Sequence, residues 1–256
     1  MKTVDILGYR VSANGRRSDV TTAWSIIQRG DKGKYMACAN PHSLVVAAQD
    51  DTFAMALHSA DILLPDGAGI LVAARLLNVH IPERVAGMEF FRELSYCANK
   101  AGGIKYFFLG STDVVLNTIT KRINSDYPNI TVCGTYSPPF AEEFTAEQNA
   151  AMVAAINASG ADVLWVGMTA PKQEKWILNH RHQLDIKFIG AIGAVFDFYA
   201  GAKQRAPSWI QNLGLEWLPR LLREPKRLWR RNFVSSPLFL SKVMGQRARQ
   251  IIEAWR

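Results

Sequence analysis

The sequence predicts an α/β fold: a Rossmann-like, mostly parallel sheet flanked by helices, followed by a basic helical C-terminal appendage. Apolar runs of strand length alternate with helix-like segments over the first 200 residues, which is typical of parallel strands joined by helical crossovers. The 256 residues are 48% hydrophobic and include 12 Phe, 7 Trp and 7 Tyr, enough for a sizeable core. Beyond Gly201 the proline spacing and the charge both change, which predicts the appendage.

The core elements follow in order from this alternation. Strands are predicted at Val4–Gly8, Lys34–Ala39, Asp61–Leu64, Ile104–Leu109, Ile130–Thr135, Asp162–Gly167 and Lys187–Ile192. Helices are predicted around Ser18–Arg29, after Pro41, and over Ala68–Leu77, Met88–Ala101, Thr112 to about Asn124, 145–157 and Pro171–His182. Gly102-Gly103 and the proline pair at 138–139 mark breaks, because these residues interrupt regular structure.

The charge divides the chain into a core, residues 1–202, and an appendage, residues 203–256. The core has 18 Lys and Arg against 19 Asp and Glu, whereas the appendage has 12 against 3, a net charge of +9 that exceeds the +8 of the whole chain. Basic residues mixed with Trp, Leu and Phe suit an anionic lipid surface. Nucleic acid, or a solvated basic face on packing helices, are the alternatives. Proline recurs at 207, 219, 225 and 237, and each can begin a short helix.

Several classes of protein and site are disfavoured. No apolar run reaches the ~18 residues of a membrane span, and the mean hydropathy is −0.03. We expect no secretory signal in Met1–Arg17, and three scattered cysteines give no disulfide framework, so the chain is expected to be cytoplasmic. No histidine pair has the spacing of a helical zinc site and no Asp-x-Asp occurs, so we predict no metal and no cofactor.

Ligands of open parallel sheets bind at the carboxyl ends of the strands. Asp66 follows a predicted buried strand there and precedes two glycines within Pro65–Gly69. Its carboxylate is suited to take a proton from an acceptor hydroxyl as a general base. Capping the helix that begins at Ala68 is the alternative role. The pattern leaves both open.

Three other segments offer contacts to a ligand. Lys172 and Gln173 fall in the first turn of a helix begun by Pro171, where they either reach the crevice or are solvated. Arg84 either meets a diphosphate or forms a surface salt bridge. The turn 110–112 either cradles a phosphate or is a plain turn and cap.

The ordered set of motifs resembles the WecG/TagA/CpsF family of bacterial glycosyltransferases and covers about residues 5–231. The matching stretches are Ala39–Pro41, Pro65–Gly69, Pro82–Gly87, Ala170–Lys175, Gly190–Asp197, Lys203–Pro207 and Gly214–Leu218. The resemblance implies an inverting, metal-independent enzyme of exopolysaccharide or cell-wall glycan assembly. It implies transfer of an N-acetylmannosamine-type sugar or glucose from a UDP-sugar to an undecaprenyl-diphosphate-linked saccharide. It further implies peripheral binding to the anionic inner face of the plasma membrane. No nucleic acid partner is expected, and assembly into a homo-oligomer is compatible with this prediction.

The resemblance also assigns residues. Asp66 matches the family's proposed base, and Arg84 and Gln173 match residues that bind the donor sugar and diphosphate. Asn40 lies in a matching pocket loop, and Cys38 stands where members often have Thr, which weakens one donor contact. The matching diphosphate-binding residues of the appendage are Arg220, Arg227 and Arg230.

Two other classes of function stay open on the sequence alone. A nicotinamide-dependent Rossmann oxidoreductase would share the α/β plan, although the Gly-x-Gly-x-x-Gly fingerprint is missing from the sequence. A non-catalytic module that binds membranes or nucleic acid would explain the basic appendage but leaves the polar strand ends unexplained.

Overall fold

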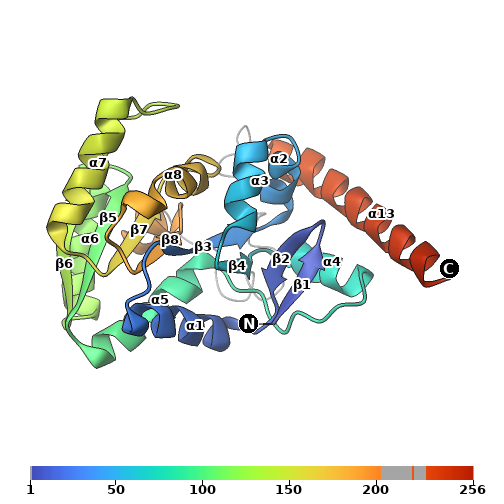
Figure 1. The fold of residues 1–256 in the computed structure, drawn as a ribbon, viewed down its shortest axis with the longest axis horizontal. Helices are drawn as coiled ribbons and strands as arrows, with labels where there is room; N and C mark the ends of the chain where they lie inside the picture. The colour runs from blue at the N-terminus through green and yellow to red at the C-terminus, as the bar shows by residue number, and fades with distance from the viewer. Residues whose placement is uncertain (1, 203–220, 222–228, 256) are drawn as a thin grey trace.

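A six-stranded parallel sheet organises the protein, whose computed structural model describes residues 2–202, 221 and 229–255 (Figure 1). The strand order is β4-β3-β8-β7-β5-β6, and every neighbouring pair is parallel. The strands are β3 (Lys34–Ala39), β4 (Ile62–Pro65), β5 (Ile104–Gly110), β6 (Ile130–Tyr136), β7 (Val163–Gly167) and β8 (Phe188–Ala191). The predicted α/β class is therefore confirmed.

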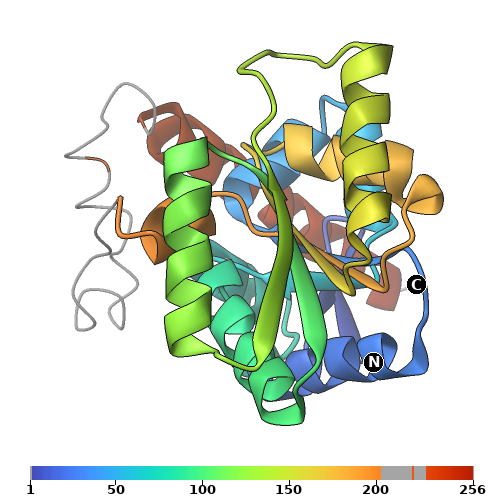
Figure 2. The ribbon, with the colours of Figure 1, turned by 90° about the vertical axis from the view of Figure 1, so that its left-hand side faces the viewer.

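Helices cover both faces of this sheet, and Figure 2 shows α6 and α7 on opposite sides of it. Side chains of α1 (Arg16–Arg29), α5 (Gly87–Ala101), α6 (Asp113–Asp126) and α9 (Val195–Tyr199) share one core with alternate strand residues. The opposite core includes side chains of α2 (Pro41–Ala47), α3 (Asp51–His58), α4 (Ala68–Leu76), α7 (Ala146–Ser159), α8 (Lys172–His180) and α13 (Ser236–Ala254). Strand side chains alternate between these cores because successive residues of a strand point to opposite faces.

The N-terminus departs from the prediction. Val4–Gly8 is not one strand of the main sheet; β1 (Thr3–Ile6) and β2 (Tyr9–Ser12) form a separate antiparallel hairpin. The hairpin turns at Leu7 and Gly8, whose φ angles are 54° and 89°. A tight hairpin turn of the primed type needs positive φ at both central residues. Leucine gives no signal for this conformation, so the sequence did not reveal the turn.

Smaller departures concern helix bounds. The helix predicted after Pro41 is two helices, α2 and α3, because Asp50 begins the second one by accepting a hydrogen bond from the Phe53 N–H at 2.9 Å. The helix predicted over Pro171–His182 ends as a 3₁₀ turn at Arg181–Gln183. Pro237 lies in the first turn of α13, as predicted, but this helix has 19 residues rather than being short and directly follows a π-helix over Arg230–Ser235. The helix starts predicted at 207, 219 and 225 lie outside the described residues.

The C-terminal helix α13 packs against α2 and α4, with Phe239 and Val243 fully buried. Buried Gln246 accepts a hydrogen bond from the Leu7 N–H (2.8 Å) and donates one to Asp5 Oδ1 (2.6 Å). The last described helix thus holds the turn of the first hairpin. The boundary predicted at residue 202 falls at the edge of the described residues and stays a prediction.

A separate observation concerns membrane crossing. Among the residues that the structure describes, none of the helices combines the length and the apolar character of a transmembrane span.

Replacing Gln246 by Leu tests how much the hydrogen bonds between α13 and the hairpin contribute to stability. The change removes both hydrogen bonds and should lower the free energy of unfolding by about 1–3 kcal/mol, measured by urea denaturation. Ser241→Ala, an exposed change on the same helix, is the control and should stay within about 0.5 kcal/mol. Equal stabilities for the two variants would show that the contact contributes nothing.

Candidate functional site

The described candidate residues gather at the carboxyl ends of β3, β4, β7 and β8. The Asp66 N–H donates to the Ala39 carbonyl at 2.8 Å, which carries the β3–β4 pairing one residue past β4. Half-buried Asp66 is thereby fixed at the strand tip, as predicted. The N-cap residue of α4 is Gly67 rather than Asp66.

Arg84 lies on a loop tied to the same strand end. The Val85 N–H donates to the carbonyl of Pro65, the residue before Asp66, at 3.0 Å. Arg84 itself is half-buried and makes an interaction of its own. The structure therefore brings the loops of Arg84 and Asp66 together, as the prediction requires.

Asn40 forms the start of α2 rather than a loose pocket loop. Its Oδ1 accepts from the Ser43 N–H at 3.0 Å, and the Ser43 hydroxyl accepts from the Asn40 N–H at 2.8 Å. This reciprocal cap, followed by Pro41, fixes the helix entry. Because Oδ1 already accepts one hydrogen bond in the cap, the Nδ2 donor is the group of Asn40 best suited to a ligand.

The segment that contains Asp66 also approaches the start of α2 closely, because Gly69 lies against Pro41. A Cβ on Gly69 would lie 2.4 Å from Pro41 Cγ, far inside contact distance. The second glycine of the Pro65–Gly69 motif is therefore a steric requirement, because it lets α4 start directly beside α2.

Cys38 lies under these loops as a neutral thiol. Its Sγ is 3.7 Å from the position of a Cβ on Gly87. Burial raises the pKa of Cys38 well above its ordinary value, and the charges of Asp66, Glu174 and Glu89 raise this pKa further. The thiol is thus surrounded by carboxyl groups, which suits a weak hydrogen-bond partner and disfavours a thiolate nucleophile.

Gln173 and Glu174 enter the site from the first turn of α8. Gln173 Nε2 donates to Glu174 Oε1 at 2.9 Å, and both side chains are nearly fully buried. Burial raises the pKa of Glu174 to about 7. The sequence interpretation identified Gln173 but missed Glu174, because a carboxyl next to a first-turn residue looks like an ordinary helix-dipole partner.

Lys172 does not reach the crevice, which corrects one of the alternatives above. Its ammonium group donates to the Ala141 carbonyl and lies 3.5 Å from the centre of the Phe144 ring. Burial lowers the pKa of Lys172. The side chain therefore holds the loop after β6 against α8. The other turn, 110–112, forms a cap: Thr112 accepts from the Val115 N–H.

The C-terminal segment reaches the start of α2. His42 Nδ1 lies 2.8 Å from Ser235 Oγ, at the end of a π-helix formed by Arg230–Ser235. Burial lowers the pKa of His42, and the positive charges of Arg231 and Arg230 lower it further. Arg230 is therefore near the helix that Asn40 caps. Sequence reasoning missed His42 because its partner is 193 residues away.

Two predicted residues and the metal prediction are not tested by the structure. Arg220 and Arg227 lie outside the described residues. Within the described ranges, no group of three or more His, Cys, Asp and Glu side chains has an arrangement that could hold a metal ion.

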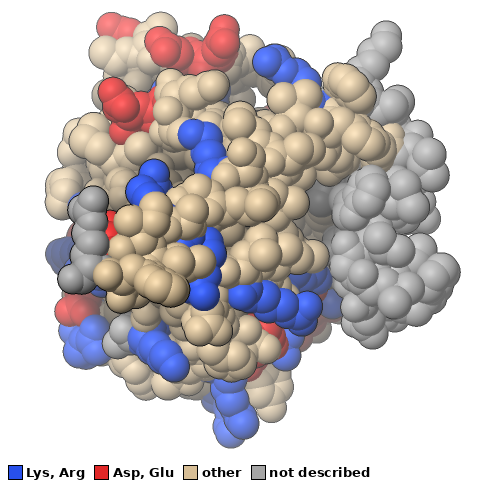
Figure 3. All heavy atoms as spheres, turned by 90° about the vertical axis from the view of Figure 1, so that its right-hand side faces the viewer, with Lys and Arg blue, Asp and Glu red and all other residues tan. Residues whose placement is uncertain are grey.

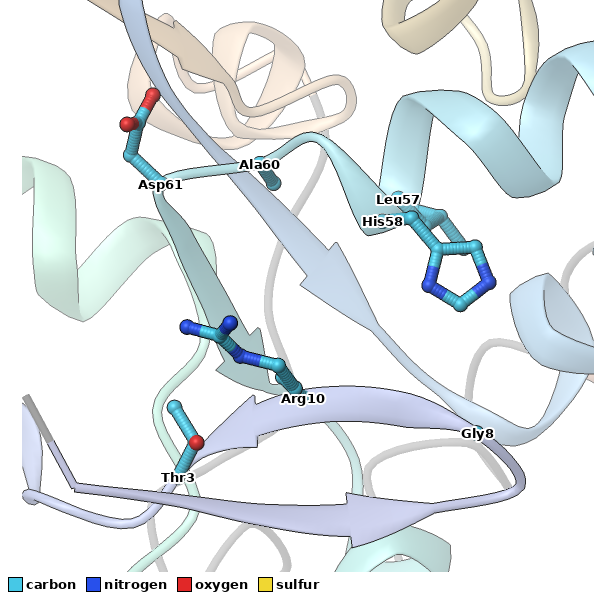
Figure 4. A pocket seen from close by; sticks show the side chains of 7 residues that line it. All are labelled: Thr3, Gly8, Arg10, Leu57, His58, Ala60 and Asp61. Carbon is cyan, nitrogen blue, oxygen red and sulfur yellow. The ribbon is translucent and has the colours of Figure 1, made fainter.

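A cavity of about 240 Å³ lies elsewhere, at the amino end of β4 (Figure 4). Its lining residues are Thr3, Gly8, Arg10, Leu57, His58, Ala60 and Asp61. Asp61 is held there by Lys34 Nζ and the Tyr35 N–H, each at 3.0 Å. Asp66 follows the opposite end of the same strand. The cavity is therefore separate from the candidate site.

An α/β sheet with an acid, an arginine loop and buried polar groups at its carboxyl edge is the architecture of an enzyme that binds a polar ligand at the strand ends. The family model for the glycosyl transferase WecG/TagA/CpsF family matches residues 4–252. The chain belongs to this family and is a glycosyltransferase, as the sequence motifs predicted. This membership decides against the oxidoreductase and the non-catalytic module.

Curated relatives agree with this assignment. A Bacillus subtilis (strain 168) protein is 34% identical over 84% of this chain and 80% of its own. A Bacillus spizizenii protein is 31% identical over the same shares, and a Staphylococcus aureus (strain MW2) protein is 29% identical over 82% and 79%. All three are named N-acetylglucosaminyldiphosphoundecaprenol N-acetyl-beta-D-mannosaminyltransferase.

Replacing Gly69 by Ala tests the steric requirement at the site. The new methyl group would overlap Pro41 and push α4 away from α2, so we expect a loss of roughly 1–3 kcal/mol in unfolding free energy. The loss is measured by urea denaturation.

The matched control is Gly245→Ala in α13, where an added Cβ meets nothing within 4 Å. Alanine is favoured over glycine by roughly 0.5–1 kcal/mol in a helix, so this variant should be slightly stabilised. A Gly69→Ala protein as stable as wild type would contradict the proposed close approach.

Proposed function

We propose that this glycosyltransferase moves a sugar from a UDP-sugar to an undecaprenyl-diphosphate-linked saccharide, with inversion at the anomeric carbon. The main support is Asp66, fixed at the tip of β4 beside the Arg84 loop, in a chain 34% identical to a mannosaminyltransferase that acts on a diphosphoundecaprenol-linked sugar. The donor sugar is of the N-acetylmannosamine type or glucose. The product belongs to exopolysaccharide or cell-wall glycan assembly.

In the proposed reaction Asp66 is the general base. An acceptor hydroxyl attacks the anomeric carbon of the donor while Asp66 takes its proton. The new C–O bond forms as the bond from the anomeric carbon to the diphosphate oxygen breaks, and UDP leaves with the electron pair on the opposite face. One in-line displacement of this kind inverts the configuration.

The leaving diphosphate is negatively charged, so the positive side chains that stabilise it must come from outside the part of the site around Cys38. The carboxyl groups of Asp66, Glu174 and Glu89 all raise the pKa of Cys38, so this part of the site is not proposed to hold the diphosphate. Arg84 and the appendage residues Arg220, Arg227 and Arg230 are proposed to supply the compensating charge. Guanidinium groups bind diphosphate oxygens in pairs, and they fulfil the role that a divalent cation has in enzymes with an Asp-x-Asp sequence. Cys38, Asn40 and Gln173 are proposed to contact the donor.

The appendage is proposed to dock on the inner face of the plasma membrane. Helix α13 buries Phe239 and Val243, while its solvent side exposes Met244, Ile252 and Trp255, the last 87% exposed. Exposed Lys242 and Arg249 lie on the same helix. Figure 3 shows the side toward which α13 runs: basic side chains stand among uncharged surface, and the largest group of acidic side chains lies at the upper left, away from most of them. Apolar side chains with neighbouring cations suit an anionic lipid surface.

Asp66→Asn tests the proposed base. Transfer should fall by roughly 10²- to 10⁴-fold, which is the usual contribution of a general base, while the affinity for UDP stays unchanged. Transfer is measured with a panel of UDP-sugars and a short-chain lipid-diphosphate saccharide, with and without EDTA. Asp51→Asn, on the exposed start of α3, is the control. Wild-type transfer by Asp66→Asn would remove Asp66 from the mechanism, and loss of wild-type transfer in EDTA would contradict metal independence.

The double variant Ile252→Ser, Trp255→Ser tests membrane docking. Each large apolar side chain buried in lipid contributes about 1.5–3 kcal/mol, so partition onto anionic vesicles should fall by at least roughly tenfold. The control pair Tyr96→Ser, Val114→Ser removes equally exposed apolar side chains from α5 and α6 and should bind as wild type. Unchanged vesicle binding by the α13 variant is the outcome that overturns this role.

A further inference from the structure

The start of α8 contains a buried polar pair, Gln173 and Glu174, of which only Gln173 has a proposed contact with the donor. Gln173 is 4% exposed and Glu174 is 3% exposed. The Gln173 amide lies against the loop after β8: a Cβ on Gly193 would be 3.4 Å from both Gln173 Oε1 and Nε2, and 3.3 Å from the Met168 carbonyl. The pair therefore lies where β7 and β8 deliver their loops to the site, and Gly193 leaves room for the amide.

The hydrogen bond within the pair gives the amide a direction. Gln173 Nε2 donates to Glu174 Oε1 at 2.9 Å, so the amide oxygen is the end of Gln173 that remains to be satisfied. The ionised form of Glu174 accepts hydrogen bonds only, which selects the NH₂ end of the amide as its neighbour. The same carboxyl is near enough to Cys38 for its charge to raise the thiol pKa, which places it on the β3 side of the site.

Both remaining oxygens of the pair are unsatisfied. Gln173 Oε1 and Glu174 Oε2 are buried and accept no hydrogen bond from any residue in the described part of the chain. A buried acceptor without a donor costs roughly 1–3 kcal/mol, so a ligand that brings a donor to this point recovers that free energy on binding. Hydroxyl and amide N–H groups are such donors, and a sugar nucleotide carries both kinds.

We propose that Glu174 is a positioning residue for the donor sugar: by accepting from Gln173 Nε2 it turns Gln173 Oε1 toward the ligand, where a sugar hydroxyl or N–H donates to it. The inference rests on the proposed function, because it requires that a sugar nucleotide binds at this edge of the sheet. It adds Glu174 to the site and states which end of the Gln173 amide faces the ligand. Without Glu174, the Gln173 amide can rotate by half a turn and place its NH₂ group opposite the hydroxyl or N–H of the sugar. Two hydrogen-bond donors would then face each other.

Two substitutions at position 174 separate positioning from folding. Glu174→Gln keeps an oxygen that can accept from Gln173 Nε2, whereas Glu174→Met has a similar size but no acceptor. Glu174→Gln keeps the hydrogen bond within the pair and is expected to melt as wild type, whereas Glu174→Met leaves Gln173 Nε2 without its acceptor and is expected to melt lower. Binding of UDP is the measurement that separates this loss of stability from damage to the folded site.

The measurement is calorimetric titration with UDP and with UDP-N-acetylmannosamine or UDP-glucose, whichever the wild-type protein binds. We expect Glu174→Met to weaken UDP-sugar binding by roughly 10- to 100-fold, the cost of one misdirected hydrogen bond at a buried site, with UDP binding unchanged. Glu174→Gln should restore most of the UDP-sugar affinity. Lys175→Met is the matched control, because Lys175 lies on the same helix as Glu174 and forms an ion pair with Asp50. This variant should bind both ligands as wild type.

The outcomes distinguish this inference from the function on which it rests. Equal UDP-sugar affinity in Glu174→Met and wild type overturns the positioning role while leaving the transfer reaction intact. Equal losses for UDP and UDP-sugar would mean general damage and also overturn it. If Glu174→Gln lost transfer as completely as Asp66→Asn, Glu174 would be a proton acceptor and not a positioning residue. A wild-type protein that binds no UDP-sugar would refute the proposed function itself.

Discussion

The site depends on how two backbone hydrogen bonds extend the parallel sheet beyond its last paired residues. The Asp66 N–H on the Ala39 carbonyl fixes the acid relative to β3, and the Val85 N–H on the Pro65 carbonyl brings the Arg84 loop to the same point. Neither bond involves a side chain, so the arrangement tolerates changes around it. The glycine at position 69 then lets two helices start side by side, and their first turns form one wall of the site.

Electrostatics divide the site into two parts. The carboxyl groups of Asp66, Glu174 and Glu89 all raise the pKa of the Cys38 thiol, and burial raises the pKa of Glu174 to about 7. In the proposed function the diphosphate is therefore held by arginines rather than at the thiol. Arg84 comes from the core, whereas Arg230 comes from the C-terminal segment, which His42 and Ser235 bring to the start of α2. Under that proposal, binding of a diphosphate and the position of this segment are coupled through charge.

The sequence predicted the features that local patterns determine and missed those that depend on distant contacts. The strands of the main sheet and the place of Asp66 follow from apolar runs and from glycines next to them. The hairpin turn at Leu7, the direction of Lys172 and the burial of Glu174 do not, because each is fixed by residues far away in the chain. Gln246 and Leu7, 239 residues apart, show the limit most clearly. Family resemblance provided the reaction class, which no pattern of residues could.

Helix α13 has apolar side chains on two sides, so hydrophobicity alone does not determine which side turns inward. Gln246 does determine it, because only one rotation of the helix brings its amide to the hairpin backbone and to Asp5. A helix rotated by half a turn would bury Met244 and Ile252 and leave the Leu7 N–H without its acceptor. A single polar side chain thus fixes the rotation of the helix about its axis. The exposed apolar side chains therefore face solvent only when the hairpin and the helix are correctly assembled.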